Sequence, residues 1–112
     1  MPVCITGMHR SGTSMVAHLL HAAGLNLGPE SNLLPATEEN PAGYWEHRDF
    51  VVLNDDLLAH VGAGWDCPPP PSVAWSDPAL APLRSRAEAL VASLAESSPW
   101  GWKDPRSCLT LP

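Results

Sequence analysis

Basic side chains are scarce in this sequence of 112 residues. Six lysines and arginines stand against twelve aspartates and glutamates, which gives a formal net charge of −6 at pH 7. A chain with this balance lacks the positive field that draws proteins to phosphate backbones. We therefore expect no nucleic acid among its partners.

Long apolar runs and closely spaced cysteines are also missing. No apolar stretch approaches the roughly 18 residues that span a bilayer, and no basic segment leads into an apolar one at the N-terminus. We therefore expect a cytoplasmic protein with no membrane partner. The three cysteines are odd in number, far apart and without C-x-x-C spacing, which indicates reduced thiols and no zinc site.

Strand and helix signals alternate along the chain, whose length suits one domain over residues 1–112. Short β-prone runs predict two strands, at 2–6 and 100–103. Apolar residues at helical spacing predict three helices, over 13–23, from about 47 to 61, and over 77–94. In the first of these helices the residues at this spacing are Met15, Val16, Leu19, Leu20 and Ala23. We expect an α/β fold with a parallel sheet and helices packed around it.

The segment between the first strand and the first helix, residues 7–14, reads GMHRSGTS. A strand, a glycine-containing loop and a helix in this order often wrap a phosphate with backbone N–H groups. In the nucleotide-binding pattern G-x-x-x-x-G-K-[ST], a lysine that reaches the β- and γ-phosphates occupies the position of Thr13, so ATP hydrolysis is disfavoured. Arg10 and the hydroxyls of Thr13 and Ser14 remain, and they suit a tetrahedral anion without a metal.

Three short motifs follow one another along the chain: RSGTS at 10–14, NPAGYWE at 40–46 and GWKDPR at 101–106. The first resembles the [KR]-S-G-T-[ST] loop of sulfotransferases that use 3′-phosphoadenosine 5′-phosphosulfate (PAPS), and the fuller string GMHRSGTSM is specific. The second and third resemble the N-P-x-G-Y-W-E and W-K-D-P-R stretches of bacterial sulfotransferase-like proteins. The resemblance covers the whole chain and corresponds to the N-terminal part of such a domain.

The resemblance implies a P-loop-type three-layer α/β fold with a parallel sheet, truncated at the C-terminus before the family's 3′-phosphate site. It implies transfer of a sulfuryl group from PAPS to a hydroxyl or amine of a small-molecule or glycan acceptor, without a metal. Glu46 would be the general base, and Arg10 and Lys103 would stabilise charge in the transition state. The residues that would bind the 5′-phosphosulfate are Arg10, Ser11, Gly12, Thr13 and Ser14.

Residue chemistry leaves several of these roles open. Arg10 is a cation near a helix N-terminus, where the helix dipole disfavours it unless an anion is bound. Lys103 would face the same crevice as the loop if the two strands are parallel, because their carboxyl ends then share one edge. Glu46 could instead cap the following helix. Arg106 is explained equally well by contact with an anion and by an ordinary surface position.

Other polar and aromatic residues have simpler explanations. His18 and His21 are three residues apart on a helix, but no third ligand is near, so we expect no metal there. Asp104 is predicted to shape the turn after the second strand by bonding to local backbone. Trp65 and Trp75 are predicted to cover the core from the loops.

Two other functions stay open at this point. A nucleotide or nucleoside kinase shares the order of strand, loop and helix, although the missing lysine counts against it. A catalytically inactive fragment that binds an anion is the second alternative. A parallel sheet that ends early leaves an unpaired edge, which would favour self-association of such a chain.

Overall fold

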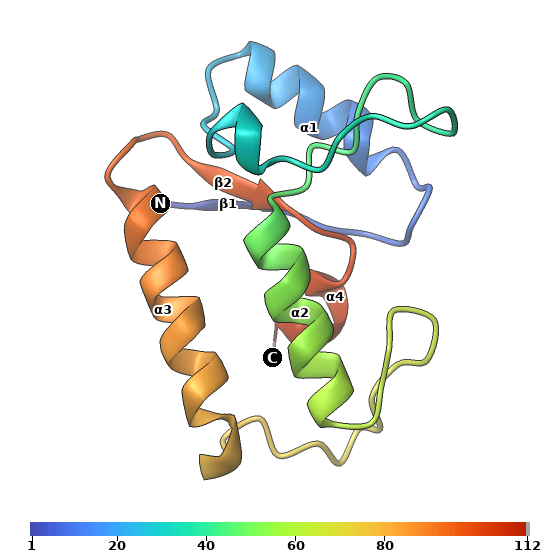
Figure 1. The fold of residues 1–112 in the computed structure, drawn as a ribbon, viewed down its shortest axis with the longest axis vertical. Coiled ribbons are helices and arrows are strands. Elements are labelled where there is room, and N and C mark those ends of the chain that lie inside the picture. The colour runs from blue at the N-terminus through green and yellow to red at the C-terminus, as the bar shows by residue number, and fades with distance from the viewer. Residues whose placement is uncertain (112) are drawn as a thin grey trace.

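The elements of the fold follow the predicted order along the chain (Figure 1). The computed structural model describes residues 1–111, and Pro112, the last residue of the predicted domain, lies outside them. The elements are β1 (Val3–Ile5), α1 (Thr13–Ala22), a 3₁₀ turn (Glu30–Asn32), α2 (Arg48–His60), a second 3₁₀ turn (Pro78–Leu80), α3 (Ala81–Ala95), β2 (Gly101–Lys103) and α4 (Ser107–Thr110). The predicted strands and three long helices are confirmed, whereas α4 is too short to show a period in the sequence.

The strands β1 and β2 form a parallel pair, with Val3 opposite Gly101 and Ile5 opposite Lys103. The other edge of β2 pairs with Asn26, so β2 lies between that segment and β1. Gly101 permits the close approach, because a Cβ there would lie 2.2 Å from the carbonyl oxygen of Val3. The parallel register places the carboxyl ends of both strands at one edge, where the loop after β1 and the side chain of Lys103 meet.

Helices cover both faces of this small sheet, with α1 on one face and α2 and α3 on the other (Figure 1). Two apolar clusters fill the spaces between the layers. One of them joins α1 to β1 and consists of Ile5, Ala17, Leu25 and Leu27. The other joins α2 and α3 to β2 and consists of Phe50, Leu94 and Trp100. The protein is therefore a compact α/β unit with a two-stranded parallel sheet.

Helix α1 has more apolar residues than the core buries. Only Thr13 and Ala17 of this helix are buried. The sheet offers two strands, so it contacts a narrow strip of the helix around the small Ala17. The residues whose spacing predicts the helix are therefore exposed: Met15, Val16, Leu19 and Leu20. Within residues 1–111, no helix combines the length and apolar character needed to cross a bilayer.

Candidate functional site

The loop over residues 7–14 enters α1 through unusual backbone conformations. Arg10 and Gly12 have φ angles of 61° and 91°, in the left-handed region. Gly12 immediately precedes α1, no side chain caps the helix, and its first turn contains no acidic residue. The first backbone N–H groups of α1 therefore have no side-chain acceptor and remain available to an external anion.

A cavity of about 420 Å³ opens at this helix N-terminus. Six of the seven site residues predicted from the sequence line it, and they come from all three motifs. Ser11, the seventh, is exposed on the loop beside the cavity. The residues that line it are Arg10, Gly12, Thr13, Ser14, Glu46 and Lys103.

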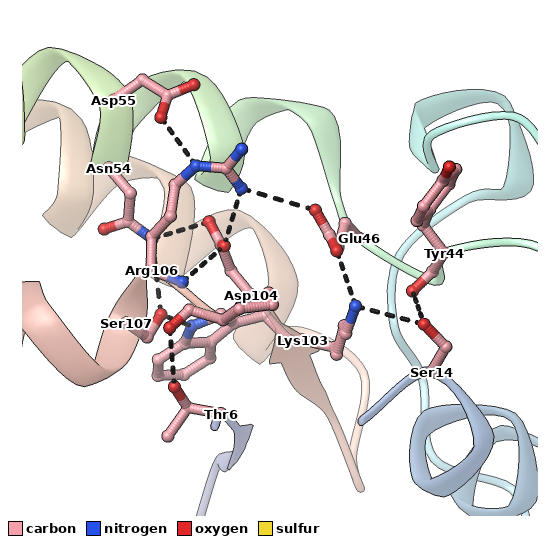
Figure 2. Close-up of polar contacts among 12 residues, drawn as sticks. Thr6, Ser14, Tyr44, Glu46, Asn54, Asp55, Lys103, Asp104, Arg106 and Ser107 are labelled. Atoms are coloured by element: carbon pink, nitrogen blue, oxygen red, sulfur yellow. Dashed lines mark hydrogen bonds and ion pairs between the residues drawn. The ribbon is translucent and has the colours of Figure 1, made fainter. Parts of the chain in front are cut away.

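Lys103 and Glu46 form a buried ion pair at the cavity (Figure 2). Lys103 Nζ lies 2.6 Å from Glu46 Oε1, and the two side chains are 2% and 7% exposed. Lys103 comes from the end of β2, and Glu46 lies two residues before α2. Glu46 does not cap that helix, because the ring of His47 accepts the backbone N–H of Asp49 instead. The alternative role of Glu46 as a helix cap is therefore wrong.

The hydroxyl of Ser14 connects the three motifs. Its Oγ accepts hydrogen bonds from Lys103 Nζ at 3.3 Å and from Asn40 Nδ2 at 3.4 Å. The same hydroxyl donates to the carbonyl oxygen of Tyr44 at 3.4 Å. An ammonium group has three N–H donors, and Lys103 uses two of them on Glu46 and Ser14. One donor therefore remains for a ligand in the cavity.

Arg106, whose role the sequence left open, lies among three carboxylates (Figure 2). Its Nη1 is 3.0 Å from Asp104 Oδ1 and 3.5 Å from Glu46 Oε2. Its Nε is 2.7 Å from Asp55 Oδ1, an ion-pair contact without hydrogen-bond geometry. Burial by itself lowers the pKa of the guanidinium, but Asp104, Asp55 and Glu46 outweigh burial and raise that pKa. Arg106 is therefore a fixed, charged part of the site and not an ordinary surface residue.

Two buried residues position Arg106: Asp104 contacts it directly, and Asn54 binds Asp104. Asp104 is fully buried and accepts hydrogen bonds from the backbone N–H of Arg106 and from Asn54 Nδ2, each at 2.9 Å. The predicted turn role of Asp104 is confirmed. Asn54 was not predicted as part of the site; it lies next to Leu53 and one helical turn after Phe50 on the apolar face of α2. A polar residue on an apolar face is the signal that could have revealed it.

Three ring residues singled out in the sequence pack against other rings: His18, His21 and Trp65. His18 and His21 lie against the ring of Trp45, with ring centroids 5.0 and 4.9 Å apart. Among residues 1–111, no group of three or more His, Cys, Asp or Glu side chains could hold a metal ion. Trp65 is half exposed and packs against His9 of the loop, with ring centroids 4.8 Å apart. The prediction that Trp65 covers the core is wrong, because its ring packs against His9 in the loop over residues 7–14 instead.

Comparison with known proteins found no match among protein-family models, curated proteins or solved structures. The sulfotransferase resemblance therefore stays a prediction that rests on the motifs. The geometry itself has two chemical capacities. An uncapped helix N-terminus and two cations suit an anion, and a buried carboxylate beside them suits proton transfer.

Proposed function

We propose that the chain belongs to a PAPS-dependent sulfotransferase with a P-loop-type three-layer fold. One observation carries the proposal: the uncapped start of α1, Arg10 and the buried Lys103–Glu46 pair all line the same cavity. Sulfuryl transfer needs an anion site, cations and a base within reach of one another. The first motif supplies the anion site and the cation Arg10, the second supplies the base Glu46, and the third supplies the cation Lys103.

The 5′-phosphosulfate would bind at the loop over residues 7–14. The free N–H groups of α1 carry a partial positive charge of roughly half a unit, which favours an anion. Thr13 is buried at the position where ATP-hydrolysing loops have a lysine. The cationic charge comes instead from Arg10 on the loop and from Lys103 at the end of β2. This arrangement supports a sulfonate and phosphate ligand over a magnesium-bound triphosphate.

Glu46 would act as the general base. It accepts the proton of the acceptor hydroxyl or amine while the acceptor oxygen or nitrogen forms its bond to sulfur. The bond between sulfur and the 5′-phosphate oxygen breaks in the same step. Lys103 and Arg10 balance the negative charge on the departing phosphate. The acceptor class we propose is a small molecule or a glycan.

Titration with 3′-phosphoadenosine 5′-phosphate, the nucleotide product of the transfer, tests this proposal. Tryptophan fluorescence is a suitable signal, because Trp45 and Trp65 contact residues that line the cavity. We expect saturable binding of this nucleotide and no binding of magnesium ATP. Preference for magnesium ATP would favour the kinase alternative. A folded protein that binds neither ligand would contradict the proposal.

A matched pair of variants assigns the binding to the cavity. Lys103→Met removes the buried cation and should weaken the affinity for the nucleotide by about tenfold or more. Arg86→Met removes the same charge from an exposed ion pair with Asp56 and should leave the affinity unchanged. Equal effects of the two substitutions would show that net charge and not the cavity determines binding.

A further inference from the structure

Glu46 has two cationic neighbours, and only Lys103 lines the anion cavity. Lys103 Nζ contacts Oε1 of the carboxylate at 2.6 Å, whereas Arg106 Nη1 approaches the other oxygen, Oε2, at 3.5 Å. Figure 2 shows the two cations on opposite sides of the carboxylate. Arg106 instead lines a separate hollow of about 220 Å³ next to Trp65. Lys103 and Arg106 therefore contact the same carboxylate, Lys103 from the cavity of about 420 Å³ and Arg106 from the separate hollow.

The contact of Arg106 with Glu46 matters because the Glu46 carboxylate competes with any bound anion for the charge of Lys103. A carboxylate 2.6 Å from a buried ammonium neutralises most of the charge that the ammonium offers to a ligand. The competition weakens when a second cation takes part of the carboxylate's charge. Arg106 is the one other cation within ion-pair distance of Glu46 among residues 1–111.

Contacts other than Glu46 keep Arg106 in place. Its guanidinium contacts Asp104 and Asp55, and its backbone N–H donates to Asp104. Asp104 is itself held by Asn54. Arg106 can therefore keep its position when Lys103 turns towards a ligand.

We propose that Arg106 is a positioning residue that shares the Glu46 carboxylate and so leaves Lys103 able to bind the anion. This inference rests on the proposed function. When the anion is bound, Lys103 directs its free N–H towards it, and Arg106 retains Glu46 beside the cavity. Glu46 is then positioned to accept the proton of the acceptor. Arg106 itself touches neither ligand nor acceptor.

A double-mutant cycle between Arg106 and Glu46 tests the inference, with affinity for 3′-phosphoadenosine 5′-phosphate as the readout. Arg106→Met should weaken binding by about tenfold, within the usual range for contacting charged residues. Glu46→Gln removes the competitor, so Arg106→Met added to it should change the affinity by less than about twofold. A merely structural role would weaken binding equally in the wild-type and Glu46→Gln backgrounds.

Two further variants keep the test decisive. Arg106→Lys keeps a charge beside the buried Asp104 and so protects the fold, but one ammonium cannot reach all three carboxylates. We expect about a threefold loss of affinity in the wild-type background and none in the Glu46→Gln background. Arg86→Met is the control for net charge and should bind like the wild type.

The outcomes separate this inference from the proposed function. Arg106 variants that bind as tightly as the wild type overturn the inference alone, and so does an equal loss of affinity with and without Glu46→Gln. A folded wild-type protein that does not bind the nucleotide overturns the proposed function and this inference with it. A loss that appears only while Glu46 is present supports both.

Discussion

Two helices, α1 and α2, begin beside the cavity, and they begin in opposite ways. At the start of α2, the ring of His47 accepts a hydrogen bond from the backbone N–H of Asp49, and the Asp49 carboxylate lies in the first turn. The start of α1 has Gly12 in a left-handed conformation, no cap and no acidic residue. A missing cap costs about 1 kcal/mol of helix stability. The comparison shows that α2 has a side-chain cap at its N-terminus, whereas the N-terminus of α1 stays uncapped, as the proposed anion site requires.

Replacement of Lys103 should have the largest effect, because this residue connects the two helix starts through Ser14 and Glu46. Lys103→Met leaves Glu46 without its closest partner, and breaking a buried pair typically costs about 3 kcal/mol or more. Arg86→Met breaks a pair of the same 2.6 Å length whose side chains are about half exposed. The control should lose less than about 1 kcal/mol. Urea unfolding measures both, and similar losses would contradict the buried role of Lys103.

A carboxylate placed at the uncapped start of α1 should give this helix the negative charge that Asp49 gives the start of α2. Ser11→Asp is expected to weaken the affinity for 3′-phosphoadenosine 5′-phosphate by about tenfold through charge repulsion. The thermal midpoint should stay the same or rise slightly, because an acid near a helix N-terminus contributes about 0.3–1 kcal/mol. Ser72→Asp, in the exposed proline-rich loop, adds the same charge as a control. Unchanged binding by Ser11→Asp would place the anion elsewhere.

The cap of α2 should affect stability and not ligand binding. His47→Ala and His47→Asn both remove the buried ring, but only Asn supplies a new acceptor for the N–H of Asp49. We expect the Asn variant to be more stable than the Ala variant by about 1 kcal/mol in urea unfolding. Its affinity for the nucleotide should stay within about twofold of the wild type. Equal stability of the two variants would argue against a capping role.

The smallest expected effect is on the pH dependence of stability. Burial lowers the pKa of His47 from its ordinary 6.5, and the nearby Asp49 only partly opposes this. The unfolded chain therefore binds a proton first as the pH falls below 6.5, so stability is lost from there down through the lowered native pKa. His47→Asn should lack this part of the loss. Thermal unfolding at about pH 7.5 and about pH 5.5 measures the difference; equal losses would contradict it.

The sequence predicted the parts of the molecule that depend on local signals. The period of the apolar residues located three helices, and the parallel pairing rule brought Lys103 to the edge where the loop after β1 lies. The side of α1 that is buried could not be predicted, because the helix has more apolar residues than a two-stranded sheet can cover. The contact between Arg106 and Asp55 depends on how α2 packs against the segment after β2. No local pattern carries that information.

The burial of Lys103 has a consequence for chemical modification of the chain. Lys103 is the only lysine in the sequence, and its side chain is 2% exposed. Reagents and enzymes that acylate, methylate or conjugate lysine side chains therefore reach Lys103 only from the cavity that it lines, or when the end of β2 opens. The rate of such modification reports how accessible Lys103 is from the cavity and how often this part of the fold opens. In this protein, side-chain amine labelling is thus a measure of the integrity of the site.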